Sequence, residues 1–539
     1  MASVKPIPPA DCPDPLERRR RIEAEPLAGN VWRIFDEAAA AVPDQALWEF
    51  FQAGRHATYR EALGSVLTLA AGLHDRGVRH GDAVALMLPN VPEYPIAWLA
   101  LARLGAVAVP INPQYTPREV GYVLSDSAAA WIVVEREALP AALSALDTLP
   151  AFARNHVIVV GDAPQPCVPF QAVAGPADAL PVNEPALDDL LAIQYTSGTT
   201  GLPKGCELTH RHWVTCGTVN ARRDGRRFRR ILASTPFFYM DPHWLLLMTL
   251  LHRATLFVAA KQSAAQFMKW VRDHSIEFCL FPELALKQPP SPLDSDNALI
   301  RINVYGITRE RHEEIERRFN VIAREAYGMT EMGNVMFMPM EATDMVGSGS
   351  CGIPSPFREC RIVAADGRVL GDDEVGELQV RGPGTMHGYH NRPDANAEAF
   401  VDGWFRTGDL FRRDARGYYY LVGRLKDMIR RSGENISALE VEQVLRGMAE
   451  VLEAAVIGVP DPIRGEELLA LVVTAKSIEP STVLDWCACN LAPFKVPRYL
   501  AIVSALPKTP SGKVAKGHLR ERWAAIQTDC FDRTRGQWL

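Results

Sequence analysis

The sequence predicts an α/β protein, with a large N-terminal domain on mainly parallel sheets, a small β-rich subdomain and a small α+β C-terminal domain. Three observations support this prediction. The chain has 539 residues, which is more than one hydrophobic core usually organises. Short apolar runs alternate with amphipathic stretches over most of its length, as is typical of βαβ units. After Arg424, strand-like and helix-like segments form a compact group of their own.

Residues 1–27 are expected to form a tail that packs late or not at all. From residue 28 on, predicted strands and helices alternate. Short continuous apolar runs predict buried strands, and the longer segments between them predict helices. The strands are expected at 83–88, 106–110, 131–134, 157–160 and 190–194. The helices are expected at 93–104, 117–125 and 138–146.

The same alternation resumes beyond residue 250, with strands expected at 254–258, 276–281 and 321–324 and helices at 263–274 and 309–319. Short strands and Gly/Asp turns predict the β-rich subdomain at about 352–423. The α+β unit is predicted from helices at 437–448 and 482–491 and strands at 453–458 and 468–474. We therefore expect a large domain over 28–425 and a small C-terminal domain over 426–539.

Composition excludes several classes of function. With 47% hydrophobic and 23% charged residues, the chain is typical of a soluble globular protein. A net charge of −6 gives no electrostatic reason to expect nucleic acid as a partner. The longest apolar region, 83–111, is broken by prolines and charges, so no membrane span is expected. The ten cysteines lack the paired spacing of a zinc site, and a cytoplasmic protein with reduced thiols is expected.

One glycine- and hydroxyl-rich stretch, Tyr195–Gly205, follows the predicted strand at 190–194 and contains the lysine Lys204. Glycines let backbone N–H groups turn toward phosphate oxygens, hydroxyls add donors, and the lysine adds a positive charge. It is not a Walker motif, because Lys204 is followed by Gly205 rather than Ser or Thr. The alternative is a flexible surface loop. The density of such residues directly after a strand favours phosphate binding.

Four further stretches point to the same chemistry. They are Tyr327–Glu331, Trp404–Asp409, Gly423–Asp427 with Ser432–Asn435, and the terminal Gly512-Lys513. Together with the first stretch they resemble the AMP-forming adenylating superfamily, which contains acyl-CoA synthetases, stand-alone adenylation domains and luciferases. The likeness covers nearly the whole chain in the expected order. Within the superfamily, the chain is most similar to crotonobetaine/carnitine–CoA ligases and their neighbours.

The resemblance implies an ATP site in the large domain. In it, Tyr327 would stack on adenine, Thr330 would contact the α-phosphate, and Glu331 would hold Mg²⁺. Contacts with the β- and γ-phosphates are implied for Thr196, Ser197, Gly198, Thr199, Thr200 and Lys204.

For the C-terminal part, the resemblance implies mobility. Asp409 would accept hydrogen bonds from both ribose hydroxyls, assisted by Arg424. Lys426 occupies the hinge position about which this domain rotates in relatives. The rotation would present first the catalytic Lys513 and then the CoA tunnel loop around Gly433 to one pocket.

The implied reaction is the ATP-dependent activation of a carboxylic acid to acyl-AMP with release of pyrophosphate, followed by transfer to the thiol of coenzyme A. Two anions meet in the first step, so a metal and a lysine at the reacting oxygens are what the chemistry needs. One alternative is a stand-alone adenylation enzyme that loads a carrier protein or another nucleophile. Another is a nucleotide-binding protein without turnover, against which the intact Glu331 and Lys513 speak.

Two departures from the superfamily pattern bear on the acid substrate. Tyr239 stands where relatives commonly have His, and 304–307 replaces a Gly-Gly-Ala segment beside adenine. Tyr239, Asp241 and Trp244 would surround a cationic acid by cation–π and charge contacts, or they are packing residues, which we favour. Three further residues, Met332, Gly333 and Asn334, are expected to line the acyl pocket by position alone.

Overall fold

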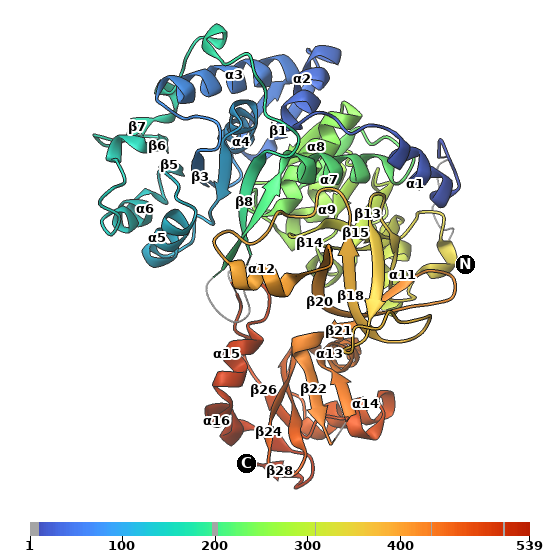
Figure 1. Cartoon of the computed structure of the whole chain (residues 1–539). Helices are drawn as coiled ribbons and strands as arrows, with labels where there is room; N and C mark the ends of the chain where they lie inside the picture. Colours follow the sequence, from blue (N-terminus) through green and yellow to red (C-terminus); the bar gives the residue numbers. More distant parts are fainter. Residues whose placement is uncertain (1–9, 197–202, 308, 433, 510–511) are drawn as a thin grey trace. The chain divides into compact units, whose positions relative to one another are not determined.

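The computed structural model describes residues 10–196, 203–307, 309–432, 434–509 and 512–539. It divides into two compact units, each formed by the described residues of several ranges (Figure 1). Unit 1 comprises Met1–Thr196, Lys204–Glu359 and Val380–Gly403. Unit 2 comprises Pro203 and the described residues of Cys360–Gln379 and Trp404–Leu539. The predicted domain boundary at residues 425–426 lies within unit 2 and stays a prediction.

The first sheet of unit 1 has the strand order β7-β6-β5-β3-β4-β8-β9 and is parallel except for β9. In chain order its strands are β3 (Ala83–Met87), β4 (Val107–Pro110), β5 (Trp131–Glu135), β6 (Val157–Val160), β7 (Val168–Pro169), β8 (Leu190–Thr196) and β9 (Lys204–Thr209). Helices α4 (Glu93–Leu104), α5 (Pro117–Asp126) and α6 (Leu139–Leu146) connect them. The core under α5 and α6 is aliphatic, as expected for strands with both faces covered.

The second sheet of unit 1 runs in the order β16-β15-β14-β13-β12-β10-β11-β1-β2. Its strands are β1 (Ala46–Phe50), β2 (Arg55–Thr58), β10 (Arg230–Ala233), β11 (Thr255–Val258), β12 (Phe278–Leu280), β13 (Arg301–Val304), β14 (Ile322–Met329), β15 (Gly333–Phe337) and β16 (Ser350–Pro354). Strands from β14 to β1 are parallel to their neighbours, and β15, β16 and β2 are antiparallel.

Some of the helices packed on this second sheet were predicted from the sequence, and others were not. The charged helix α11 (Arg309–Phe319) and α9 (Ala264–Asp273) lie where the sequence predicts helices. Four helices without a sequence prediction are α2 (Val31–Ala41), α3 (Tyr59–Asp75), α7 (His210–Arg222) and α8 (Met240–His252). Helices α7 and α8 pack side by side (Figure 1), and both are buried over most of their length.

The N-terminal segment differs from the expected loose tail, over its described part. Helix α1 (Pro15–Ala24) begins at Asp14, whose carboxylate accepts hydrogen bonds from two backbone N–H groups. Arg18 of this helix is buried and donates from Nε to the carbonyl oxygen of Arg223 at 2.7 Å. It also pairs with Glu341 at 3.1 Å. The prediction of loose packing was wrong here. Arg18 binds buried acceptors that lie far away in the sequence, so the residues around it gave no sign of these contacts.

Unit 2 contains the β-rich strands and an α+β group. The β-rich strands are β17 (Glu359–Val363), β18 (Gly376–Arg381), β20 (Trp404–Arg413) and β21 (Tyr419–Arg424). A mixed sheet follows with β22 (Met428–Arg431), β23 (Glu434–Ser437), β24 (Val451–Asp461), β25 (Gly465–Thr474), β26 (Tyr499–Ile502), β27 (Phe531–Asp532) and β28 (Gln537–Trp538). Helices α13 (Ala438–Gly447), α14 (Pro480–Asn490), α15 (Lys516–Glu521) and α16 (Trp523–Ile526) pack against it.

These features confirm the predicted α/β class, with a large N-terminal part on parallel sheets and a smaller C-terminal part. Among the described helices, none combines the length and the hydropathy that crossing a bilayer requires.

Candidate functional site

The glycine-rich stretch joins two antiparallel strands. Thr196 at the end of β8 lies opposite Lys204 at the start of β9. The Thr196 hydroxyl donates to the carbonyl oxygen of Lys204 at 3.3 Å, which closes the base of the connection. The predicted phosphate ligands Ser197, Gly198, Thr199 and Thr200 lie outside the described residues, and their roles stay predictions.

Lys204 and Glu331 are brought together by one aromatic residue. The Lys204 ammonium lies 4.8 Å from the centroid of the Tyr389 ring. The Tyr389 hydroxyl donates to Oε1 of Glu331 at 3.0 Å. Burial, and then the charge of Glu331, raises the pKa of Tyr389 above its ordinary value, so the hydroxyl stays a donor. Tyr389 thus contacts a cation at its ring and a carboxylate at its hydroxyl, and a metal-bound polyphosphate needs groups of both charges nearby.

Tyr389 is a residue that the sequence prediction missed. It belongs to a segment that runs back beside β9, where Glu207 N–H donates to Gly388 at 2.9 Å and His390 N–H donates to Gly205 at 2.8 Å. No motif surrounds Tyr389 in the sequence. Its importance follows only from the pairing of this segment with β9.

The loop after β14 is fixed by a second missed residue, Arg358. Its buried guanidinium donates to the carbonyl oxygens of Met332 at 2.6 Å, Asn334 at 3.0 Å and Pro383 at 2.7 Å. Three carbonyl acceptors around one guanidinium leave the loop little freedom. Arg358 therefore positions the backbone next to Glu331.

Glycine is required in this loop at Gly333, whose φ is 67°. A Cβ there would lie 2.2 Å from the Cys216 sulfur of α7, so any side chain would push the loop from the helix. Met332 and Gly333 are both buried. Thr330 and the Tyr327 ring, both half-buried, lie before them at the carboxyl end of β14, where ligands bind in α/β sheets. The predicted roles of these four residues stay predictions.

The start of α8 holds the three aromatic and acidic residues predicted around the acid. The Trp244 indole donates to Oδ1 of Asp241 at 3.1 Å, and the Trp244 ring packs edgewise on Phe278 with centroids 6.4 Å apart. Trp244 is buried, whereas Tyr239 and Asp241 are half-buried. The contacts of Trp244 support the packing interpretation for that residue.

The unusual segment after β13 is held by Glu325 of β14. Its buried carboxylate accepts hydrogen bonds from the backbone N–H groups of Gly306 at 3.0 Å and Ile307 at 3.2 Å. Burial raises the pKa of Glu325 to about 7. Glu325 therefore fixes the backbone that replaces the Gly-Gly-Ala segment.

Replacing Glu325 with Gln is expected to change how stability depends on pH. Because the pKa is raised from 4.5 to about 7 on folding, the side chain's contribution to stability is complete below about pH 4.5 and is lost as pH rises through 7. Gln does not titrate. The free energy of unfolding of the wild type, minus that of the variant, should therefore fall by up to about 1.4 kcal/mol per pH unit in this window. Urea denaturation of both proteins from about pH 4.5 to 8 measures this; curves that stay parallel would contradict it.

In unit 2, the predicted ribose ligands lie opposite each other on β20 and β21. Arg424 Nε lies 3.0 Å from Oδ1 of the buried Asp409. Lys426 follows in a short 3₁₀ turn, Leu425–Asp427, and burial lowers its pKa. The neighbouring Asp427 is tied to α15 by Arg520 at 2.9 Å and by Lys516 at 3.7 Å.

Lys513 is exposed in a turn where the Thr509 N–H donates to its carbonyl oxygen at 2.7 Å. Gly433 lies outside the described residues. The roles of Lys513, Lys426 and Gly433 stay predictions.

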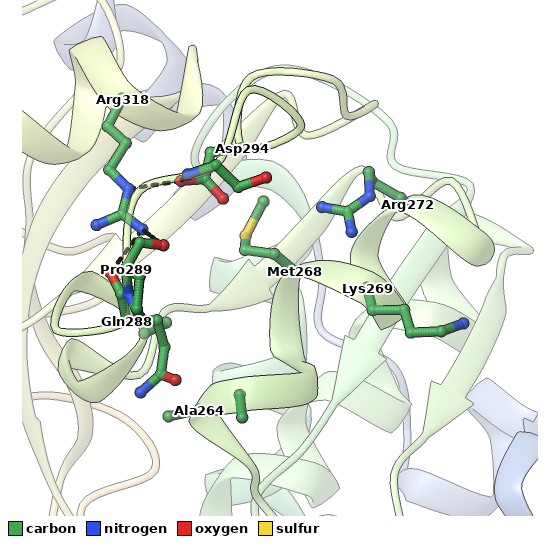
Figure 2. Close-up of a pocket in the computed structure, with 11 residues that line it drawn as sticks. Ala264, Met268, Lys269, Arg272, Gln288, Pro289, Asp294 and Arg318 are labelled. Carbon is green, nitrogen blue, oxygen red and sulfur yellow. Dashed lines mark hydrogen bonds and ion pairs between the residues drawn. The ribbon is translucent and has the colours of Figure 1, made fainter.

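A hollow between α9 and residues 285–294 contains none of the predicted site residues (Figure 2). Arg318 there bonds to Asp294 at 2.7 Å and to the carbonyl oxygens of Leu286 at 2.8 Å and Gln288 at 2.9 Å. Its charge is thus compensated within the chain, and the hollow is a structural junction. Among the described residues, no group of three or more His, Cys, Asp or Glu residues could hold a metal ion by itself.

The parallel sheets place Lys204, at the start of β9, and Glu331, just after β14, beside one tyrosine, and α/β proteins of this kind commonly bind nucleotides at such a place. Residues 35–390 match the AMP-binding enzyme family, and residues 440–513 match the AMP-binding enzyme C-terminal domain. The chain belongs to the AMP-binding enzyme family. It is an ATP-dependent, AMP-forming acid–thiol ligase, as the resemblance predicted.

Individual relatives agree with this class. Feruloyl-CoA synthase of Amycolatopsis sp is 34% identical over 479 residues, covering 87% of this chain and 94% of that protein. Crotonobetaine/carnitine–CoA ligase of Salmonella arizonae is 29% identical over 511 residues, covering 90% and 96%. The structure of Bacillus subtilis o-succinylbenzoate CoA synthetase with ATP and magnesium superposes with a TM-score of 0.80, at 25% identity, covering 92% and 99%.

Proposed function

We propose that this ligase activates a small carboxylic acid to acyl-AMP and then transfers the acyl group to the thiol of coenzyme A. The observation that carries the proposal is the Lys204–Tyr389–Glu331 arrangement, with 4.8 Å and 3.0 Å between successive groups. A cation beside a carboxylate is what a metal-bound polyphosphate needs. Relatives whose names end in CoA ligase or CoA synthase support CoA as the acceptor.

We assign Mg²⁺ to Glu331. Mg²⁺ is commonly held by one or two carboxylates together with substrate phosphates, and one buried carboxylate at a strand end fits that pattern. When bound, the ion would supply charge neutralisation at the phosphates. Tyr389 would orient the carboxylate by its hydrogen bond to Oε1.

The other residues would act by position and charge. Lys204 and Thr196, with the glycine-rich connection between them, would hold the pyrophosphate leaving group. Asp409, oriented by Arg424 at 3.0 Å, would accept the ribose hydroxyls. Lys513 would neutralise the reacting carboxylate and α-phosphate. No protein nucleophile is needed, because both steps depend on positioning and charge neutralisation.

A cytoplasmic location is part of the proposal. In the described part of the chain none of the ten cysteines forms a disulfide, and most of them are buried. Free thiols are typical of a reducing compartment.

The test is ATP–pyrophosphate exchange over a broad panel of carboxylic acids, followed by CoA or carrier-protein thiols as acceptors. Exchange that depends on one class of acid, and thioester formation with CoA, is the expected result. Exchange followed by transfer only to a carrier protein would favour the stand-alone adenylation enzyme. Lack of exchange with every acid would contradict the proposal.

Replacing the proposed hinge residue Lys426 with Pro is expected to impair one half-reaction far more than the other. Asp427 is tied to α15, so a rotation of the C-terminal part would change the backbone dihedrals just before it, at Lys426. Proline fixes φ there. Lys426→Ala, which keeps the backbone free, is the matched control. Pyrophosphate exchange and thioester formation from supplied acyl-AMP are measured separately, and equal losses in both would refute the hinge.

A further inference from the structure

One face of the second sheet of unit 1 carries polar residues where a core is expected. Along β13, Ile302 and Val304 point into the aliphatic core with α9 and α11. Because side chains alternate, Arg301 and Asn303 point to the opposite face, toward α7, and Tyr305 continues this row. Arg301 and Asn303 are buried, whereas the Tyr305 ring is 50% exposed. The row therefore leads from the surface at the carboxyl end of β13 into the interior.

The deep end of this row has an excess of positive charge. Arg301 forms an ion pair with Asp224, and Arg223 donates from Nη2 to Oδ1 of Asn303 at 3.2 Å. Arg223, Asp224 and Arg301 are each at most 1% exposed. Only Arg301 pairs with Asp224, so the cluster holds two guanidinium groups and one carboxylate, and Oδ2 of Asp224 and Nε and Nη2 of Arg301 have no hydrogen-bond partner among the described residues. Among the described residues, Nε and Nη1 of Arg223 have no hydrogen-bond acceptor.

A buried guanidinium with two unbonded nitrogens lowers the stability of the fold unless a ligand binds to it. A buried ion without a full set of partners destabilises the folded state. Burial and the like charge of Arg301 lower the pKa of Arg223 to about 10, which still leaves it charged at neutral pH. A planar guanidinium with two unused donor nitrogens is suited to a carboxylate or a comparable oxyanion.

The row is connected to the loop that carries Glu331. Asn220, one turn before Arg223 on α7, exchanges amide hydrogen bonds of 3.0 Å and 3.3 Å with Asn334. Asn334 lies three residues after Glu331 in the chain. Helix α7 therefore joins the proposed metal-binding loop to Arg223 within one helical turn, about 5 Å along the axis.

The shallow end of the row is the half-exposed ring of Tyr305. Its hydroxyl points inward, 3.5 Å from Nδ2 of Asn303. Burial, and then the charge of Asp241, raises the pKa of this hydroxyl to about 12, so it stays protonated. Asp241 belongs to the start of α8 and is one of the three residues that the sequence placed either around the acid or in packing. The row thus begins at the expected acyl pocket.

We propose that the acid activated by this ligase carries a second acidic group, a carboxylate or sulfonate, and that Arg223 and Asn303 bind it. The inference rests on the proposed function and specifies its substrate class. Tyr305 follows β13 directly and lies two residues from Asn303, a step of about 7 Å in extended backbone. With the reacting carboxylate placed beside Tyr305, the spacer between the two acidic groups would be about that length, such as an aromatic ring or a short chain. The second group would neutralise the excess charge.

The test is pyrophosphate exchange with matched acids that differ only in the distal group: benzoate and terephthalate, and heptanoate and pimelate. The wild type is expected to prefer the diacid of each pair. In Arg223→Met, kcat/KM for the diacid should fall about 10²-fold, the cost of removing one partner of a buried charge pair. The monoacid should change by less than about threefold, within the usual effect of a change away from the contact. Arg223→Lys keeps the positive charge but lacks the planar guanidinium, so its kcat/KM for the diacid should lie between those of the wild type and Arg223→Met.

Two further variants separate recognition from stability. Arg226, a nearby half-buried arginine, pairs with Glu341 at 3.3 Å, so Arg226→Met should leave the ratio of diacid to monoacid unchanged. Asn303→Asp places a carboxylate beside Arg223. It should raise Tm, because it supplies the counter-ion, and should abolish the preference for diacids. A purely structural cluster would show the stabilisation without the change in preference.

Several outcomes would overturn the inference. They are a wild type without preference for either diacid, a preference that Arg223→Met leaves unchanged, or equal losses for both acids in Asn303→Asp. If Arg223→Met does not fold, Asn303→Asp decides. Lack of exchange with every acid would contradict the proposed function instead. In that case, equilibrium dialysis of labelled terephthalate with the wild type and Asn303→Asp tests the inference without turnover, and equal binding to both would overturn it.

Discussion

Replacing Lys513 with Ala is expected to slow acyl-AMP formation by about 10²–10³-fold and to leave thioester formation from supplied acyl-AMP largely intact. In the first half-reaction a carboxylate approaches an α-phosphate, and the lysine would neutralise both. In the second half-reaction the acyl-AMP bond already exists, so that neutralisation is no longer needed. ATP–pyrophosphate exchange and the release of AMP from synthetic acyl-AMP in the presence of CoA measure the two steps separately.

The same turn offers a matched control. Lys508, also a lysine, forms an ion pair with Glu453. Because such surface pairs contribute at most about 1 kcal/mol, Lys508→Ala should alter either half-reaction by less than about fivefold. If Lys513→Ala lowered both half-reactions to the same degree, the proposed division of roles would be refuted.

Glu331→Gln is expected to reduce pyrophosphate exchange by about 10²–10³-fold and to raise the concentration of Mg²⁺ required for half-maximal rate. The amide keeps the size of the side chain but removes the negative charge. The Tyr389 hydroxyl, 3.0 Å away, can still donate to the amide oxygen, so the local packing should survive. Titration of the exchange rate with Mg²⁺ at saturating ATP is the measurement.

Tyr389→Phe separates positioning from charge. It removes the hydrogen bond to Glu331 but keeps the carboxylate and the ring beside Lys204. One hydrogen bond to a charged group contributes about 1.5 kcal/mol or more, so the rate of pyrophosphate exchange is expected to fall about tenfold.

For Glu331→Gln, an unchanged dependence of the exchange rate on Mg²⁺ would show that another group holds the ion.

Periodicity predicted α9, whose residues form a buried and an exposed face and whose ends lie within one residue of the prediction. Helix α4 spans the predicted residues Glu93–Leu104 although nearly all of its residues are buried, so its place between two predicted strands made it predictable. Helices α7 and α8 were missed because nearly all their residues are buried, polar ones such as His212 and His243 included, so their polar residues do not mark a side that faces solvent. Helix α1 was missed for a different reason: its sequence is charged on all sides, and only Arg18 and Ile22 are buried.

The candidate site was predictable where its residues share a contiguous motif. Lys204 and Glu331 lie in such motifs, and the described structure brings them to one tyrosine. Tyr389 and Arg358 act through contacts with strands and loops far away in the chain, and an isolated Tyr or Arg carries no pattern. The surplus charge at Arg223 was hidden for the same reason, since it depends on the pairing of Arg301 with Asp224.

The contact of Arg18 with Arg223 has a consequence for exchanging segments between this enzyme and its relatives. The N-terminal helix holds the carbonyl oxygen of Arg223 at 2.7 Å, at the end of the helix proposed to determine the acid. A chimera that takes α7 alone from a relative would have a mismatched contact between Arg18 and this carbonyl oxygen. The transplantable module therefore consists of two pieces that are distant in sequence, α1 and α7, and they must be moved together.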